Sequence, residues 1–157
     1  MTQQPASSRI SAEGVDPKAV LEVCLCYNVR RAARAITRRY DAALAPTGLT
    51  AGQFGILAAV AALRPMPMPV LRQILAMDRT SLNRTLKPME NKGLLLVSPG
   101  AGRRAGSVTL TEEGVLAFRE AAPLWRATQA DASARLGTGR TGQVLTALSI
   151  ATALFDQ

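Results

Sequence analysis

Residues 78–110 read DRTSLNRTLKPMENKGLLLVSPGAGRRAGSVTL, and they carry the strongest indication of the fold. Asp78 is a favourable N-cap, and residues 79–93 after it have the apolar spacing of an amphipathic helix. Two short apolar runs, 94–97 and 108–110, flank a tip that holds three glycines, a proline and two adjacent arginines. Apolar runs around such a tip are typical of paired strands. The stretch therefore predicts a helix followed directly by a β-hairpin.

A second short helix is predicted immediately before this one, over VLRQILAM at residues 70–77. Almost nothing joins the two helices, which is the arrangement of a helix-turn-helix. Two helices and a tight turn, followed by a hairpin, make a winged helix-turn-helix. We expect this lobe to cover about residues 50–111.

The rest of the chain predicts helices. One long helix is expected over 18–44, started by Pro17 and stopped by Pro46 and Gly48, and a second from the N-cap Thr50 to residue 62. RPMPMP at 64–69 is expected to be an extended connector or a very short edge strand. After the hairpin, Thr111 caps a helix that GTGRTG at 137–142 breaks, and a last helix follows from 142. GTGRTG matches a dinucleotide-binding pattern, but a helix and not a strand precedes it, so it is interpreted as an interhelical turn. The expected fold is mainly α with a small β-hairpin wing, as one domain over 18–157 after a flexible arm at 1–17.

Composition excludes several classes of protein. The 157 residues include no histidine, which removes Ser-His-Asp and Cys-His catalysis and every His-ligated metal site. The carboxylates are few and scattered, so we expect neither an enzyme nor a cofactor or metal. No run approaches 18 apolar residues and the N-terminus has no apolar signal region, so the expectation is a cytoplasmic protein without membrane contact.

Positive charge is concentrated in the middle of the chain. Residues 30–104 hold thirteen Lys or Arg and three Asp or Glu, although the chain as a whole carries a formal charge of only +8. A solvated basic surface is the plain alternative. A polyanionic partner explains the concentration better, and double-stranded DNA is the first candidate.

The helix over 79–93 has two chemically different faces. Leu82, Leu86 and Met89 are predicted to point into the core, and a set of hydroxyl, amide and cationic side chains points away from it. Such side chains read base edges and hold phosphates in the major groove, while arginines at the hairpin tip suit a narrow minor groove. The candidate DNA-binding residues are Thr80, Ser81, Asn83, Arg84, Lys87, Asn91, Arg103 and Arg104.

Three segments, GLTAGQFGILAAV, LAMDRTSLNRTLKPMENKGLLLVS and RRAGSVTLTEEG, together resemble the MarR family of bacterial transcription regulators. The resemblance covers about residues 20–155. It implies a homodimer packed through the first and last helices (18–44 and 112–157), binding to pseudo-palindromic operators, and release by a small-molecule effector, phenolic or peroxide. At the wing the family usually has Asp-x-Arg; here Arg104 matches the arginine and Gly102 replaces the aspartate.

CLCYNVRRAARAITRRY at 24–40 is similar to the first helix of the organic-hydroperoxide-sensing OhrR branch of that family. Cys26 and Tyr40 have the fourteen-residue spacing of that branch, which makes Cys26, with Cys24, a candidate redox sensor. Arg30 stands where a tyrosine is usual, and its positive charge one turn from Cys26 favours a thiolate. Redox sensing, a structural thiol and a place in an effector pocket all stay open for Cys26. The candidate effector-pocket residues are Cys26, Arg30, Tyr40 and Trp125.

Two functions from different classes are consistent with these patterns. The first is a DNA-binding transcription regulator, namely a homodimeric repressor of the MarR type. The second is a nucleoid-type basic protein that binds nucleic acid without sequence preference. Affinity that ignores sequence and falls steeply with salt would identify the second.

Overall fold

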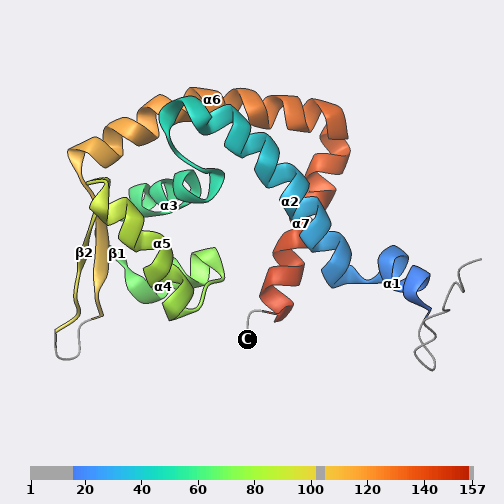
Figure 1. Cartoon of the computed structure of the whole chain (residues 1–157), viewed down its shortest axis with the longest axis horizontal. Coiled ribbons are helices and arrows are strands. Elements are labelled where there is room, and N and C mark those ends of the chain that lie inside the picture. The colour runs from blue at the N-terminus through green and yellow to red at the C-terminus, as the bar shows by residue number, and fades with distance from the viewer. Residues whose placement is uncertain (1–15, 102–104, 156–157) are drawn as a thin grey trace, which may run out of the picture. The chain divides into compact units, whose positions relative to one another are not determined.

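The computed structural model describes residues 16–101 and 105–155, which form helices and one small antiparallel sheet (Figure 1). They group into two units, one that ends at Arg38 and one that starts at Arg39. The mainly helical fold with a hairpin wing is as predicted. The helices are α1 (Pro17–Val23), α2 (Leu25–Leu44), the 3-10 helix η1 (Ala45–Thr47), α3 (Ala51–Ala62), α4 (Met68–Leu75), α5 (Arg79–Asn91), α6 (Glu112–Leu136) and α7 (Thr138–Phe155), and the strands are β1 (Met66–Pro67), β2 (Leu95–Ser98) and β3 (Ser107–Leu110).

The prediction of one continuous helix over 18–44 is wrong, because two helices cover this range. The helix is interrupted at Cys24, whose ψ of 112° is extended, so α1 and α2 are separate. The Asn28 side-chain amide stabilises the interruption by donating to the carbonyls of Leu21 at 3.2 Å and Cys24 at 3.0 Å. The break thus has its own hydrogen bonds, which helix propensity along the chain does not reveal.

In the second unit, the predicted stop and start signals around residues 46–50 are confirmed. Gly48 ends η1 in the left-handed conformation at φ +69°, which glycine adopts without strain. The Thr50 hydroxyl accepts from Gln53 N at 3.2 Å and the Gln53 side chain accepts from Thr50 N at 3.1 Å, a capping box that begins α3. The capping fixes where α3 enters the core.

The core of the second unit surrounds α3. Its residues Phe54, Ile56, Leu57 and Val60 are buried, which explains why this helix is apolar nearly all round. Several of the elements around α3 contribute further buried side chains, among them Leu44, Leu71, Leu82, Leu86, Met89, Leu95 and Val108. In the described part of the chain no single helix is long and apolar enough to cross a membrane; only α2 and η1 combined with α3 reach that length and hydropathy, and they are bent by 76°.

The sheet has the order β1–β3–β2, with β3 antiparallel to both neighbours. RPMPMP supplies the predicted edge strand, because Met66 pairs with Val108 and Pro67 with Ser107. The connector is shorter than predicted: α4 already begins at Met68, with Pro69 in its first turn, where a missing N–H is tolerated. β2 and β3 pair from Leu95–Leu110 to Ser98–Ser107 and form the predicted hairpin.

Helices α6 and α7 follow the hairpin. The Thr111 hydroxyl caps α6 by accepting from Gly114 N at 3.0 Å, as predicted. The predicted break over 137–142 is wrong in extent, because only Gly137, at φ +85°, stands between the helices and α7 starts at Thr138. One glycine with a positive φ is enough to turn the chain, so the remaining residues of GTGRTG are helical.

Candidate nucleic-acid interface

The pair α4–α5 has the tight connection of a helix-turn-helix. Ala76 ends α4 in the left-handed conformation at φ +47°, and Met77 N donates back to the Arg72 carbonyl at 3.0 Å. Asp78 then starts α5 by accepting from Ser81 N at 2.9 Å. Only three residues separate the helices, so α4 fixes the direction in which α5 presents its outer face.

The two predicted faces of α5 are confirmed. Leu82, Leu86 and Met89 are 0, 2 and 0% exposed and pack into the core. Pro88 lies inside the helix without ending it. The polar side chains predicted for the outer face are all exposed: Thr80, Asn83, Arg84, Lys87 and Asn91. The helix therefore offers hydroxyl, amide and cationic groups to a partner, while its apolar side is buried in the core.

Ser81 differs from the other predicted contacts. It is half-buried, and its hydroxyl donates to the Asp78 carboxylate at 2.6 Å. This bond is the largest of the causes that hold the pKa of Asp78 below its ordinary value, and the Ser81 N–H adds to it. The Ser81 hydroxyl therefore stabilises the start of α5 and has its proton committed there.

Lys87 is held by a neighbour on the same helix. Its ammonium lies 3.1 Å from the Glu90 carboxylate, and this hydrogen bond is the main cause that lowers the pKa of Glu90. Exposed pairs of this kind are weak, so a phosphate can replace the carboxylate as the partner of Lys87. Arg84 forms no ion pair within the described residues.

The wing requires glycine at its base. A side chain at Gly106 would place its Cβ 2.8 Å from the Ser98 carbonyl oxygen, across the hairpin, so β2 and β3 approach closely there. Gly106 therefore serves the close pairing of the hairpin itself. Arg103 and Arg104, the predicted minor-groove contacts, lie outside the described residues.

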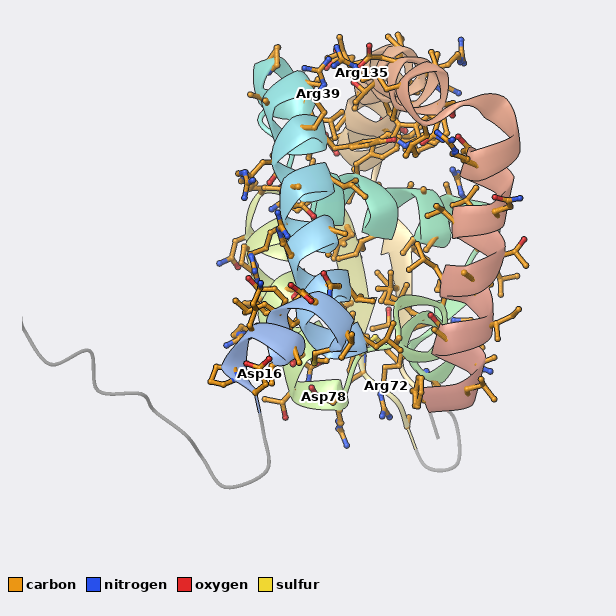
Figure 2. The ribbon with its side chains drawn as sticks, turned by 90° about the vertical axis from the view of Figure 1, so that its right-hand side faces the viewer. Asp16, Arg39, Arg72, Asp78 and Arg135 are labelled. Carbon is orange, nitrogen blue, oxygen red and sulfur yellow. The ribbon has the colours of Figure 1, made fainter. Side chains whose placement is uncertain are left out.

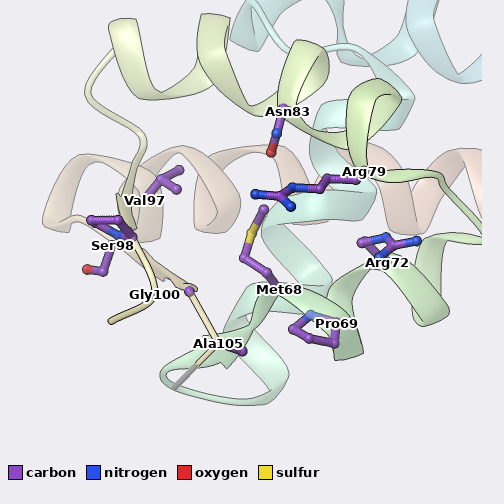
Figure 3. A pocket seen from close by; sticks show the side chains of 11 residues that line it. Met68, Pro69, Arg72, Arg79, Asn83, Val97, Ser98, Gly100 and Ala105 are labelled. Atoms are coloured by element: carbon purple, nitrogen blue, oxygen red, sulfur yellow. The ribbon is translucent and has the colours of Figure 1, made fainter. Parts of the chain in front are cut away.

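A cavity of about 610 Å³ lies between α4, α5 and the base of the wing (Figure 3). Arg79 and Asn83 contribute to it from α5, and Arg72 contributes from α4. Sequence reasoning did not assign Arg72 or Arg79, although both belong to the basic central region. Arg79 lies on the flank of α5 and not opposite its core face. Only the folded structure shows that this flank faces the hairpin across the cavity. The other lining residues are Met68, Pro69, Val97, Ser98, Pro99, Gly100, Ala105 and Gly106.

The candidate sensor residues of the first unit are largely accessible. Cys26, in the first turn of α2, is exposed, and Arg30 one turn further on is exposed as well. Cys24 is half-buried at the break between α1 and α2, where its Sγ accepts from Tyr27 N at 3.5 Å. Cys24 thus caps α2 and has a structural task that Cys26 does not share.

Two further residues of the predicted effector pocket belong to the second unit. The Tyr40 hydroxyl donates to Gln129 Oε1 at 2.5 Å, and burial raises the pKa of Tyr40. Trp125, 37% exposed, stacks on Phe54 with ring centroids 5.8 Å apart. Both residues therefore connect α6 to elements that precede it in the chain. Arg39 of α2 does the same, because it forms an ion pair with Asp131 of α6, which also pairs with Arg135 (Figure 2).

This order of elements, α4, a tight turn, α5 with an exposed polar face, and then a two-stranded wing, defines a winged helix-turn-helix protein. Comparison with known proteins agrees. Residues 47–104 match the MarR family. The DNA-bound transcriptional regulator MosR of M. tuberculosis is 38% identical, with a TM-score of 0.74 over 83% of this chain and 97% of that one.

More distant similarities include one by sequence and one by structure. The HTH-type transcriptional regulator YwoH of Bacillus subtilis is 26% identical over 96 residues, 61% of this chain and 70% of YwoH. The transcriptional repressor CouR bound to p-coumaroyl-CoA is 22% identical, with a TM-score of 0.72 over 87% of this chain and 96% of CouR. The chain belongs to the MarR family and is a DNA-binding transcription regulator.

Proposed function

We propose that the protein is a homodimeric repressor that binds a pseudo-palindromic operator. Two copies of α5 would enter major grooves about 34–36 Å apart, or a multiple of that distance. The observation that carries the proposal is the exposed polar and cationic face of α5 beside the wing. In this proposal the protein acts in the cytoplasm by binding alone, without catalysis.

The exposed apolar surface of α7 supports a homodimer. Leu148, Leu154 and Phe155 are 43, 61 and 75% exposed, and Leu145 and Ile150 are each more than half exposed. A helix with this much exposed apolar surface is typical of an interface. In the first unit Val20, Leu21, Val23 and Leu25 are exposed too. A second copy of the chain is the partner that the family resemblance implies for both surfaces.

Release from DNA would follow from a shift between two states of the dimer. An effector releases DNA only if it binds more tightly to the state in which the two α5 helices do not fit adjacent half-sites. CouR, which shares the fold, has p-coumaroyl-CoA bound. We propose a small-molecule effector, phenolic or peroxide, for this chain too, with Cys26, Arg30, Tyr40 and Trp125 as candidate contacts.

Oxidation of Cys26 is the second route to release. Its thiolate would attack an organic hydroperoxide, become a sulfenic acid and leave the hydroperoxide reduced to an alcohol. The exposure of Cys26 supports this route, since an oxidant reaches an accessible thiol most easily. Cys24, which caps α2, is the weaker candidate sensor.

The test is a titration of the reduced protein by fluorescence anisotropy at two salt concentrations. DNA from upstream of its own gene is compared with the same DNA scrambled. We expect a preference of about 10³-fold or more for the upstream DNA that persists at the higher salt. Arg84→Ala should lose about ten- to a hundredfold of that preference for each half-site, because a base contact is worth about 1–3 kcal/mol. Arg126→Ala, which removes an exposed arginine in the middle of α6, is the matched control.

Each other outcome contradicts part of the proposal. Equal and steeply salt-dependent binding to both DNAs would identify a nucleoid-type protein without operator choice. An equal loss on both DNAs for Arg84→Ala would rule out base reading by this residue. Once a complex is found, an organic hydroperoxide is added to wild type and to Cys26→Ser; release from both would exclude Cys26 as the sensor.

A further inference from the structure

The cavity beside the wing has a positive side and an apolar side. Figure 3 shows the Arg79 side chain extending across it between Asn83 and Met68, with Arg72 at its edge beside Pro69. No acidic side chain is among the described residues that line it. A cavity of about 610 Å³ falls in the range of built binding sites, about 300–1,000 Å³.

Arg79 is free to bind an anion. It is exposed, and within the described residues it takes part in no ion pair. The nearest acid along the chain, Asp78, already accepts from the Ser81 hydroxyl and N–H. Arg72 is more constrained, because its Nε donates to the Met77 carbonyl at 3.4 Å. The guanidinium that reaches into the cavity is therefore that of Arg79.

The opposite wall suits a ligand that is not wholly charged. Met68 and Val97 are half-buried and line the cavity with methyl and methylene groups. A phosphodiester strand combines the two chemistries, since each anionic phosphate is joined to a largely apolar deoxyribose. A duplex that contacts both α5 and the wing would also have to run past the mouth of this cavity, which opens between them.

The geometry points to this cavity as a seat for the DNA backbone, in which Arg79 holds a phosphate and Met68 and Val97 contact the adjoining deoxyribose. Arg72 at the edge adds positive charge to the approach. The inference rests on the proposed binding of DNA by α5 and the wing together. Since a phosphate carries no sequence information, this contact positions α5 and adds affinity without selecting bases.

The test compares wild type with Arg79→Gln and Arg79→Lys on upstream and scrambled duplexes over a series of salt concentrations. Arg79→Gln should lower the affinity of the proposed homodimer about 25- to 100-fold, equally on both duplexes, because each protomer loses one charge-assisted contact worth about five- to tenfold at a partly exposed site. The slope of log K against log salt should become shallower by about 1.8, the value for two phosphates, one for each protomer of the proposed homodimer. Arg79→Lys should keep the slope, because it keeps the charge.

Arg126→Gln is the control, and it should leave affinity and slope unchanged. If Arg79→Gln has the wild-type affinity and slope, the cavity does not bind the DNA backbone through Arg79, while the proposed function stands. A loss confined to the upstream duplex would make Arg79 a base contact and would also overturn the seat. If wild type binds neither duplex, the seat and the proposed function fail together.

Discussion

Gly114 shows how one atom can decide the packing of two elements. A Cβ at this position of α6 would lie 1.9 Å from the Leu94 carbonyl oxygen and 2.9 Å from its carbon. Both are backbone atoms, which cannot move aside as the end of a side chain can. Leu94 leads into β2, and the same carbonyl accepts from Thr111 N at 3.3 Å. The start of α6 can approach the hairpin this closely only without a side chain.

We expect Gly114→Ala to lower the free energy of unfolding by about 3 kcal/mol, at the upper end of what overpacking usually costs. Urea unfolding followed by circular dichroism measures it. Gly55→Ala is the matched control, because Gly55 lies inside α3 and a Cβ there meets nothing within 4 Å. In that variant the higher helix propensity of alanine should stabilise by up to about 1 kcal/mol. If both substitutions stabilise the protein, the close approach at Leu94 does not constrain the fold.

At the scale of the element, α5 depends on the charge state of its cap. Hydrogen bonds from the Ser81 hydroxyl, and next from the Ser81 N–H, lower the pKa of Asp78 from its ordinary 3.8. The folded state therefore favours the ionised carboxylate more than the unfolded chain does. A lowered pKa stabilises the fold above the unfolded value, and that contribution is lost as the pH falls through the folded value.

We expect wild type to be more stable than Asp78→Asn at pH 7 and the difference to shrink as the pH falls below about 4. Asparagine is a comparable N-cap but has no charge to lose. Urea unfolding of both proteins from neutral to acidic pH measures the difference, in which the other carboxyl groups cancel. Ser81→Ala should shrink the same difference, because it removes the largest cause of the shift. A difference that is constant with pH would contradict an ionised cap.

At the scale of the whole molecule, the exposed apolar surface of α7 leads to a prediction about assembly. Leu148→Glu would place a charge in the proposed interface, where it cannot be hydrated. We expect this variant to sediment as one 16.6 kDa chain and wild type as two. Operator affinity should fall with it, because two α5 helices no longer bind as one unit.

Ala62→Glu adds the same charge at an exposed position at the end of α3, outside the proposed interface, and should leave the dimer intact. Unchanged far-ultraviolet circular dichroism of Leu148→Glu would show that the helix itself survives. If wild type sediments as a single chain under the same conditions, the exposed surface of α7 is not a dimer interface.

Most element boundaries of the second unit follow from local chemistry that the sequence displays. Thr50, Asp78 and Thr111 each cap the helix predicted for them, because a side-chain oxygen one residue before a helix meets its free N–H groups. The periodic Leu82, Leu86 and Met89 separated the core face of α5 from its outer face. The predictions failed at the break at Cys24, where the Asn28 side chain donates to carbonyls four and seven residues earlier, and at the start of α7, where Gly137 alone turns the chain.

Sequence patterns are sufficient to predict a winged helix-turn-helix with an exposed polar and cationic face on α5. Capping, apolar period and turn residues all act between near neighbours, so they can be read along the chain. Tertiary structure alone decided that Arg79 reaches into a cavity against the wing, that Ser81 is committed to its cap, and that Gly106 and Gly114 have no room for a side chain. These properties depend on how closely separate elements approach and which donors remain free, and those distances are set only when the core packs.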